Sequence, residues 1–340
     1  MGRRPEILDI HTPTLFANAV RRAVDLLRAG QAVAMPTETV YGLAANALDP
    51  EAVARVFAAK GRPSHNPIIV HVASLCLARQ STSGWPDAAD RLAAAFWPGP
   101  LTMVLPKAAA IPDLVTAGGS TVGIRWPRHP FFQAVLRECG FPLAAPSANA
   151  SNRLSPTSAE HVRLSLGDRI PLIIDGGHCQ VGIESTVIDL CSQPPRVLRP
   201  GMIDEPSLTA VLGRIGTGTA ASIPTEPLRS PGQLDRHYAP RARLSVLAWT
   251  DDNDLRRQLA ARGWREGECW AVAHSHIPEP GGLAGVSVIP HDAEAFARAL
   301  YAELHRCDQA GARRIVVEAP PPAPEWHAIT DRLRRGSADP

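Results

Sequence analysis

Residues 32–39 read AVAMPTET, a short apolar run that a proline ends and that polar side chains follow at once. The same arrangement recurs at Ile124-Arg125-Trp126-Pro127, Ala145-Pro146-Ser147-Ala148-Asn149 and Leu198-Arg199-Pro200. Proline has no N–H to give to a strand ladder, so each run predicts a strand that stops there. In open α/β sheets, ligands collect beyond the carboxyl ends of strands. We therefore expect these strand ends to share one ligand crevice.

Apolar patterns on either side of this stretch predict a layered α/β domain. Short apolar runs predict strands at Ala32–Met35, Ile68–Val72, Leu101–Leu105, Val122–Arg125, Leu143–Ala145, Leu172–Ile174, Thr186–Leu190 and Val197–Leu198. Apolar residues at helical spacing predict helices at Leu15–Ala29, Glu51–Lys60, Ala88–Phe96, Phe131–Glu138 and Ser158–Leu164. The predicted fold class is α/β, a sheet flanked by helices.

A second α/β unit is predicted after a linker. Residues 213–241 are rich in Gly, Thr, Ser and Pro and have no hydrophobic period, which is typical of a linker. The pattern then restarts, with strands at Leu244–Ala248, Trp270–Ala273, Val286–Ile289 and Ile315–Val317 and helices at Leu255–Ala261, Ala293–His305 and Trp326–Arg334. We predict a first domain at residues 1–212 and a small second domain at residues 242–340.

Length and composition narrow the class of protein. The 340 residues are 45% hydrophobic and 20% charged, which fits a folded chain of two domains. No apolar run approaches the ~20 residues that a bilayer requires, and residues Met1–Glu6 lack the apolar stretch of an export signal. Six cysteines without a C-x-x-C pair favour reduced thiols and argue against a cysteine zinc site. We expect a cytoplasmic protein without membrane contact.

The net charge and the short motifs give weaker indications of what the protein binds. The net charge of +2 argues against nucleic-acid binding through bulk charge, so any RNA contact must be local. The stretch Lys60-Gly61-Arg62-Pro63, with Asn66 after it, offers two cations to a polyphosphate, although basic residues in a last helical turn also complement the helix dipole. Residues 216–221, GTGTAA, match a dinucleotide pattern but follow no strand, so we reject that site. His274 and His276 lack a further ligand at metal spacing, which favours a structural role.

Eight motifs in order along the chain carry a resemblance to a known family. They are PTETVYGL (36–43), KGRPSHNPIIVHV (60–72), FWPGPLT (96–102), VGIRWP (122–127), APSANASNRLSPT (145–157), IIDGG (173–177), GIESTVIDL (182–190) and VLRPG (197–201). In these motifs the sequence resembles the YrdC/Sua5 threonylcarbamoyl-AMP synthases, and residues 230–240 with the second domain resemble the longer Sua5 form. The resemblance implies a YrdC-like twisted mixed sheet with flanking helices and a ligand crevice, plus a small Rossmann-like C-terminal Sua5 domain.

The resemblance also implies an activity. The family condenses L-threonine, bicarbonate or CO2, and ATP into threonylcarbamoyl-AMP and pyrophosphate. A separate transferase then passes the threonylcarbamoyl group to adenosine 37 of tRNA. Mg²⁺ is expected to accompany ATP as the cofactor, the linker is expected to act as a lid, and tRNA binding by the chain itself is expected to be weak at most.

The family's site residues carry over to matching positions of this sequence. Threonine is expected to contact Thr39, His71, Arg125, the backbone of Ala145, and Ser185. ATP is expected to contact Arg62, Asn66, Thr121, Ser147, Asn149, Ser155, Arg199 and, from the linker, Tyr238. Lys60 and Arg62 are expected to be the catalytic cations near the phosphates, and the metal ligands stay unassigned. Arginine at 125 suits a carboxylate because its planar fork binds both oxygens.

The sequence departs from the family pattern at three positions. His65 stands where Asp is common, Asn152 stands where Gly is common, and Trp126 adds bulk beside Arg125. None of these changes removes a polar group that the chemistry uses.

Two other functions stay open at this point. An RNA-binding module without chemistry would show salt-dependent RNA affinity and no ATP turnover. A carbamoyl transferase of the hydrogenase-maturation kind carries a related domain, but together with Cys-rich zinc motifs that this sequence lacks.

Overall fold

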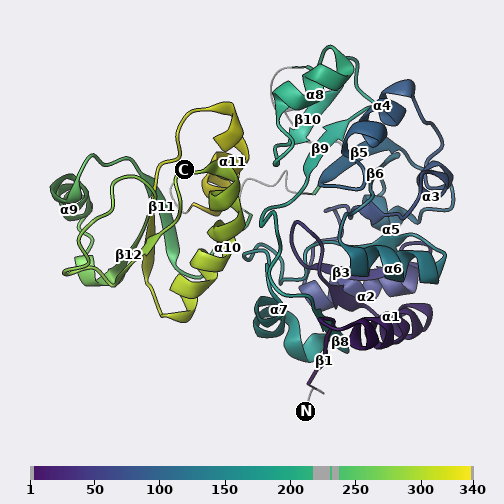
Figure 1. The fold of residues 1–340 in the computed structure, drawn as a ribbon, viewed down its shortest axis with the longest axis horizontal. Coiled ribbons are helices and arrows are strands. Elements are labelled where there is room, and N and C mark those ends of the chain that lie inside the picture. The colour runs from purple at the N-terminus through teal and green to yellow at the C-terminus, as the bar shows by residue number, and fades with distance from the viewer. Residues whose placement is uncertain (1–3, 217–229, 232–236, 338–340) are drawn as a thin grey trace. The chain divides into compact units, whose positions relative to one another are not determined.

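The structure is a computed structural model that describes residues 4–216, 230–231 and 237–337 (Figure 1). It divides into two compact units, the first made of residues 1–151 and 155–233 and the second of residues 152–154 and 234–340. Most of the predicted linker, and the GTGTAA stretch except for its first glycine, lie outside the described residues. The domain boundaries drawn from the sequence therefore stay a prediction.

One ten-stranded mixed sheet forms the centre of the first unit, in the order β1-β8-β2-β3-β7-β4-β6-β5-β9-β10. Its strands are β1 (Glu6–Asp9), β2 (Val33–Met35), β3 (Gly42–Asn46), β4 (Val70–His71), β5 (Leu101–Pro106), β6 (Thr121–Arg125), β7 (Leu143–Ala144), β8 (Leu172–Asp175), β9 (Thr186–Asp189) and β10 (Arg196–Arg199). Its α-helices are α1 (Pro13–Arg28), α2 (Pro50–Lys60), α3 (Leu75–Gln80), α4 (Asp87–Phe96), α5 (Asp113–Thr116), α6 (Pro130–Cys139), α7 (Ala159–Leu166) and α8 (Glu205–Leu212).

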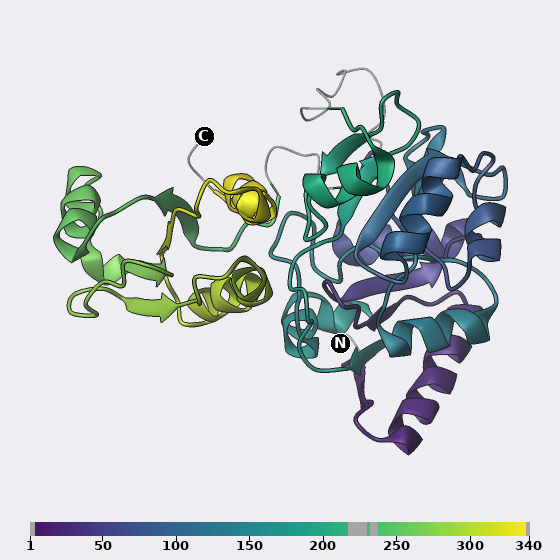
Figure 2. The ribbon, with the colours of Figure 1, turned by 45° about the horizontal axis from the view of Figure 1, so that its top comes forward.

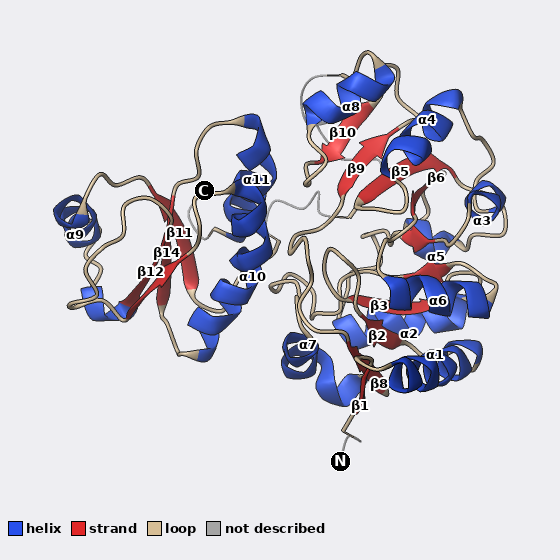
Figure 3. Ribbon diagram, in the orientation of Figure 1, coloured by secondary structure: helices blue, strands red, loops and turns tan. Residues whose placement is uncertain are grey.

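Helices cover both faces of this sheet (Figure 3). On one face α1 packs against α6, and the rings of Phe16 and Phe131 meet edge to face with centroids 5.3 Å apart. Val33 and Met35 belong to the core on that face, while Ala34 belongs to the core under α2 and α7. This alternation is the period of two that a strand imposes. The predicted α/β class is confirmed.

Most elements lie where the sequence pattern predicts them, and β3 is the informative exception. Its sequence GLAAN contains no β-branched or aromatic residue, so it carries almost no strand propensity. It forms because the 36–41 loop returns the chain antiparallel to β2, with Ala34 opposite Leu43. Pairing with a neighbouring strand therefore outweighs local preference here.

Strand register brings two predicted site residues and one further polar residue to one place. His71 of β4 and Thr102 of β5 both stand opposite Arg125 of β6. Residues that face each other across strands point to the same side of a sheet. The end of β6 therefore presents an imidazole, a hydroxyl and a guanidinium on one face.

Helix α2 delivers the basic loop. The Asp49 side chain caps its first turn by accepting the N–H groups of Glu51 and Ala52, and Pro50 stands at the first helical position. The helix ends at Lys60 because Gly61 adopts a left-handed conformation with φ of 60°. Both ends of this helix are thus fixed by local chemistry.

The second unit contains a four-stranded parallel sheet in the order β11-β14-β12-β13. Its elements are β11 (Arg243–Leu247), α9 (Asp252–Ala261), β12 (Cys269–Ala273), β13 (Gly285–Val288), α10 (Ala293–Gln309), β14 (Arg314–Glu318) and α11 (His327–Gly336). Figure 2 shows α9 on one side of this sheet and α10 and α11 on the other. This is the small Rossmann-like arrangement that the resemblance to the Sua5 form implies. Across the described residues, no helix combines the length and the apolar character needed to cross a membrane.

The buried side chain of Glu318 lies at the carboxyl end of this second sheet and accepts backbone N–H groups there. Glu318 accepts the backbone N–H groups of His274, Ser275 and His276 at 2.7, 2.9 and 3.1 Å, and its carboxylate also meets Nδ1 of His276 at 2.7 Å. The His274 ring packs on Trp326, with centroids 5.6 Å apart. No group of three or more His, Cys, Asp or Glu within the described ranges is placed to hold a metal ion.

Candidate active site

The loop at residues 36–41 holds neighbouring loops in place through its backbone. The carbonyls of Glu38 and Thr39 accept the N–H groups of Val181 and Gly182 at 2.7 and 3.1 Å. The carbonyl of Tyr41 accepts the N–H of Ala148 at 2.8 Å. Segments after β2, after β7 and before β9 therefore meet. The first two follow strands that the strand–proline pattern predicts, and the third lies outside that pattern.

An ion pair lies at the centre of this meeting point. Nη2 of Arg125 lies 2.8 Å from Oε1 of Glu38, and both side chains are 5% exposed. Although these atoms are close, neither the Glu38 carboxylate oxygens nor Nε and Nη2 of Arg125 make a hydrogen bond of acceptable angle with any described residue. The charges attract each other, but their hydrogen-bonding capacity is unused.

Electrostatics keeps Glu38 ionised. Burial would raise the pKa of its carboxyl, but the charge and contact of Arg125, together with the backbone amides of Glu38 and Arg128, outweigh burial, so the pKa lies below its ordinary value. A buried ion pair with unmade hydrogen bonds stabilises a fold poorly, because the desolvation cost of two charges is not recovered. This pair is therefore a candidate for binding a ligand.

His71 stands beside this pair as a neutral imidazole. Burial and the nearby Arg125 guanidinium lower its pKa to about 3. Its Nδ1 is buried and has no partner among the described residues. On the adjoining loop, the hydroxyls of Thr37 and Thr39 lie 2.9 Å apart. Neutral donors and acceptors thus surround the charged pair.

Arg199 and Ser185 continue the site toward β9 and β10. Nε and Nη2 of Arg199 donate to the carbonyl and the hydroxyl of Ser185, each at 3.1 Å. The Ser185 hydroxyl lies 2.8 Å from that of Thr102, which stands opposite Arg125 in the sheet. A buried polar chain therefore links two predicted site residues, Arg199 and Ser185, to Thr102 of β5, the cross-strand neighbour of the predicted residue Arg125 on β6.

Gly201 makes this contact sterically feasible. A Cβ at position 201 would lie 2.4 Å from the backbone nitrogen of Thr186 and 2.8 Å from the carbonyl carbon of Ser185. Only glycine lets the loop after β10 approach so closely. The glycine of the VLRPG motif therefore fixes Arg199 against Ser185.

Lys60, at the end of α2, makes hydrogen bonds to the loop after β7. The Lys60 ammonium donates to the carbonyls of Ser147 and Asn149, and burial, followed by the charges of Arg62 and Arg169, lowers its pKa well below the ordinary value. Two of its three N–H donors are thus used on the loop after β7.

The Arg62 guanidinium is turned toward its own loop. Its Nη2 donates to Oδ1 of Asn66 and to the carbonyl of Pro67, both at 2.7 Å. Nδ2 of the buried Asn66 has no partner in the part of the chain that the structure describes. Arg62 thus ties the loop to itself, and the amide nitrogen of Asn66 stays available as a donor.

Comparisons with known proteins identify the family. A family model described as telomere recombination, Sua5_yciO_yrdC, matches residues 25–201, and a model described as threonylcarbamoyl-AMP synthase, C-terminal domain, matches residues 203–338. A threonylcarbamoyl-AMP synthase of Pyrococcus abyssi is 40% identical over 321 residues, which are 94% of each chain. The chain belongs to the Sua5 threonylcarbamoyl-AMP synthase family.

Further relatives agree with this assignment. A threonylcarbamoyl-AMP synthase of Bacillus subtilis is 47% identical over 228 residues, 67% of this chain and 66% of the relative. The crystal structure of P. abyssi Sua5 complexed with L-threonine has a TM-score of 0.89 and 36% identity, and the match covers 98% of this chain and 97% of that one. The resemblance inferred from eight motifs is confirmed, and the chain is an enzyme of the two-domain Sua5 form.

Other predicted site residues of this Sua5 chain lie around the same loops. The Ser155 hydroxyl donates to Oε1 of Glu184 at 2.5 Å, next to the Ser185 segment. The N–H of Ala145 donates to the carbonyl of Ile69, which leaves the Ala145 carbonyl as its backbone group for a ligand. Thr121 stands at the amino end of β6, about 13 Å along the strand from Arg125 at ~3.3 Å per residue.

Tyr238 lies in the second unit. It is 2% exposed, and the Arg332 guanidinium lies 5.1 Å from its ring centre. Its φ of 62° is a left-handed conformation, which costs free energy for a bulky side chain. Its expected ATP contact stays a prediction.

The backbone explains one departure from the Sua5 pattern. Asn152 has a φ of 63°, a conformation that glycine adopts freely and that asparagine tolerates better than other residues with a side chain. Asparagine therefore replaces glycine here at low cost. His65 is exposed, so its imidazole faces solvent.

Sequence reasoning passed over three residues of this Sua5 site. Glu38 lies inside the PTET motif, Glu184 lies inside the IEST motif, and Thr102 ends FWPGPLT. All three are buried polar residues whose partners come from other loops. A charged or polar residue inside an otherwise matched motif is the signal that could have found them.

Proposed function

We propose that this chain condenses L-threonine, bicarbonate or CO2, and ATP into threonylcarbamoyl-AMP and pyrophosphate, using the crevice around Arg125. The observation that carries the proposal is the buried Glu38–Arg125 pair, whose atoms lie 2.8 Å apart with unused hydrogen-bonding capacity. The product would be handed to a separate transferase that acts on tRNA.

The charges of this pair match those of an α-amino acid. The Arg125 fork would bind the threonine carboxylate through two parallel hydrogen bonds. The Glu38 carboxylate, ionised because its pKa is lowered, would hold the α-ammonium. Inserting the zwitterion replaces one ion pair by two and leaves no buried charge without a partner. This role for Glu38 adds to the residues that the sequence predicts.

Neutral groups would hold the rest of the threonine. We assign its hydroxyl to Thr39 and to the neutral His71, whose Nδ1 has no partner among the described residues. Ser185 and the Ala145 carbonyl would complete the pocket. A buried site built for a hydroxyl rejects an analogue without one, because its own polar groups are then left unpaired.

ATP would lie along the basic loops. We assign its phosphates to Lys60, Arg62, Ser147, Asn149 and Arg199, and the remaining contacts to Asn66, Thr121, Ser155 and Tyr238. Asn66 supports this through its spare buried amide donor. Mg²⁺ would enter as Mg-ATP, since this ion keeps phosphate oxygens and water as most of its ligands.

The chemistry then needs positioning more than covalent catalysis. The threonine α-ammonium first releases a proton to solvent. The free amine then attacks the carbon of CO2 and releases a second proton to give a carbamate; with bicarbonate, this second proton leaves together with hydroxide as water. A carbamate oxygen attacks the α-phosphorus of ATP in line, and the bond to the bridging oxygen of pyrophosphate breaks. Orientation of two bound reactants can supply about 7–11 kcal/mol. Lys60 and Arg62 would stabilise the growing phosphate charge.

We also propose residues 1–212 as the catalytic domain, 213–241 as a linker and 242–340 as the C-terminal domain. The described part of the linker supports a role near ATP. Nη1 of Arg199 donates to the carbonyl of Pro231 at 3.4 Å, and Ser230 is buried.

The direct test is pyrophosphate release from Mg-ATP by the purified chain, with threonine and bicarbonate each present or omitted. We expect release only when both are present. Release without threonine, or no release under any condition while ATP still binds, would contradict the proposal. Valine in place of threonine serves as the matched substrate control, because it has the same shape without the hydroxyl.

A further inference from the structure

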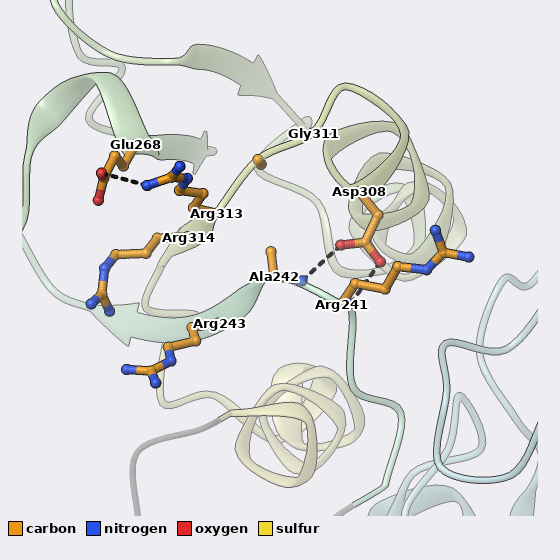
Figure 4. Close-up of a pocket in the computed structure, with 9 residues that line it drawn as sticks. Arg241, Ala242, Arg243, Glu268, Asp308, Gly311, Arg313 and Arg314 are labelled. Carbon is orange, nitrogen blue, oxygen red and sulfur yellow. Dashed lines mark hydrogen bonds and ion pairs between the residues drawn. The ribbon is translucent and has the colours of Figure 1, made fainter.

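The amino end of the second sheet carries a concentration of arginines that the proposed active site does not use. Six of them come from the starts of β11 and β14 and from the turn before β12: Arg241, Arg243, Arg262, Arg265, Arg313 and Arg314. Figure 4 shows four of them around a hollow of about 490 Å³. We call this set the arginine edge.

Two members of the arginine edge face each other directly. Arg243 of β11 stands opposite Arg314 of β14 in parallel register, so both side chains leave the same face of the sheet. Figure 4 shows them extending to the same side of the edge. Adjacent strands lie only about 4.8 Å apart, and like charges in opposed positions are destabilising. This arrangement favours an anion between or above the two guanidinium groups.

The acids near the arginine edge do not neutralise these two. Glu268 pairs with Arg313 at 3.0 Å, and Glu266 pairs with Arg256. The Asp308 carboxylate accepts the backbone N–H groups of Arg241 and Ala242 at 2.7 and 3.0 Å.

The remaining arginines differ in what holds them. Arg262 donates to the carbonyl of Gln258, where α9 ends. The side chains of four arginines have no carboxylate or carbonyl partner in the described part of the chain: Arg241, Arg243, Arg265 and Arg314. The edge therefore keeps an uncompensated positive charge in a protein whose net charge is only +2.

The shape of the edge suits a chain more than a compact ligand. A second hollow of about 560 Å³ shares Glu268, Gly311, Ala312 and Arg313 with the first, so the two form one open trough. Sites for small molecules are typically enclosed and mostly apolar. Beside the trough, Arg314 stacks on the half-buried Trp264 with 4.5 Å between guanidinium and ring centre. Surfaces that bind single-stranded nucleic acid typically combine a basic groove with aromatic side chains.

We propose that the arginine edge binds the phosphate backbone of an RNA chain, with Arg243 and Arg314 as the central contacts. The choice of RNA over DNA rests on the proposed function, whose product is destined for tRNA. Binding at this edge is otherwise independent of the adenylation chemistry.

The test measures binding of a fluorescein-labelled RNA stem-loop to the full chain by anisotropy, between about 50 and 200 mM KCl. In the double variant Arg243→Gln/Arg314→Gln we expect affinity at the low-salt end to fall about tenfold or more. The slope of log Kd against log salt should fall by about one unit for each lost phosphate contact. Pyrophosphate release should stay at the wild-type rate.

The matched control is Arg257→Gln/Arg334→Gln, which removes the same charge from exposed, ion-paired arginines of the same unit. Its slope and affinity should stay close to the wild type. Equal losses in both double variants would overturn the proposal in favour of bulk charge.

Competitors separate the other ligand classes. Displacement of the RNA by ATP or pyrophosphate at matched phosphate concentration would indicate a small-anion site and overturn the proposal. Displacement by polyglutamate would indicate an acidic protein partner, and equally tight binding of the matching DNA would overturn the choice of RNA. If the double variant fails to fold, the single variant Arg243→Gln gives the same slope test at one exposed residue. If the wild type shows the expected slope of log Kd against log salt but releases no pyrophosphate, the proposed function is contradicted and the RNA-binding proposal is not.

Discussion

Two buried glutamates, one in each unit, show how differently this chain treats a carboxylate. Glu38 and Glu318 are 4% and 3% exposed. Glu318 accepts three backbone N–H groups, and a ring nitrogen of His276 lies 2.7 Å away. Glu38 has one charged neighbour, Arg125, and no hydrogen bond of good angle on its side chain among the described residues. Burial alone therefore does not distinguish a structural acid from a functional one.

The two glutamates differ in how many hydrogen bonds their carboxylates accept. Backbone N–H groups at the carboxyl end of a parallel sheet often receive an anionic ligand, and in the second unit the protein's own carboxylate occupies them. Burial would raise the pKa of Glu318, but these hydrogen bonds and the nearby histidines hold it below the ordinary value. The first unit leaves its charged pair unsaturated, which leaves capacity for a substrate.

The largest effect is expected at Arg125. Arg125→Ala leaves Glu38 as an uncompensated buried charge, which typically costs ~3–5 kcal/mol. We expect the unfolding free energy to fall by that order and kcat/KM for threonine to fall about a hundredfold or more, while ATP affinity changes little. Steady-state pyrophosphate assays and urea unfolding measure these quantities.

The double variant Glu38→Ala/Arg125→Ala sharpens this test, because it removes both charges. It should recover much of the lost stability and none of the lost threonine affinity. Recovery of both would show that the pair is structural, and an equal loss of ATP affinity would contradict the assignment of Arg125.

Glu318→Ala is the counterpart in the second unit. It leaves three backbone N–H groups without their acceptor, one of them buried and two half-buried, and an unsatisfied buried group costs roughly 1–3 kcal/mol. We expect the second unit to lose about 2–4 kcal/mol, seen as faster hydrogen exchange over residues 269–276. The threonine KM should not move. A KM shift like that of Arg125→Ala would erase the distinction between the two acids.

Gly201→Ala probes how closely the loops of the first unit pack. The new Cβ would lie 2.4 Å from the Thr186 nitrogen, so the loop that carries Arg199 must shift. Overpacking of this kind costs typically 1–3 kcal/mol. We expect a lower melting temperature and a raised KM for ATP. Gly167→Ala is the control, since Gly167 has a right-handed φ of −39° and a Cβ there would lie 3.8 Å from Cγ of Arg163, an ordinary contact. Similar ATP kinetics in both variants would remove Arg199 from the site.

The last effect is absent at neutral pH and appears only in the acid range. The pKa of His71 is about 3 in the fold and 6.5 ordinarily, so the unfolded chain takes up the proton first as the pH falls. The stability that is present above pH 6.5 is therefore lost progressively toward pH 3, by up to about 1.4 kcal/mol per pH unit. The lowered pKa of Glu38 adds a loss in the same direction at lower pH.

His71→Asn should flatten this dependence, because asparagine does not titrate. Urea unfolding followed by tryptophan fluorescence at several pH values between 7 and 4 measures it. An unchanged slope in the variant would mean that His71 is protonated with an ordinary pKa in the fold.

Much of the predicted site follows from the sequence, because the prolines mark where strands end. Arg125 and Arg199 each close such a strand, and the structure links both to the same set of loops. Ser147 and Asn149 follow another strand end and are tied to Lys60 through their carbonyls. Local pattern was enough for these residues.

Other features depend on partners far along the chain. Glu38 lies within the first stretch considered, yet nothing in its neighbours predicts burial against Arg125. The opposed pair Arg243 and Arg314 is equally hidden, since it arises only from the register of β11 with β14. Strand β3 has little propensity of its own and forms by pairing. Register and long-range pairing are the quantities that composition and periodicity do not contain.

In the proposed binding mode, the 2.8 Å contact between Glu38 and Arg125 would compete with the substrate. Threonine would have to displace the Glu38 carboxylate before Arg125 is available, so its measured affinity would be a difference between ion pairs and not the strength of one. A ligand with a carboxylate but no ammonium, such as a hydroxy acid, would displace Glu38 and leave its carboxylate buried without a cationic partner. Under this proposal, the resting ion pair would favour amino acids over simple organic acids.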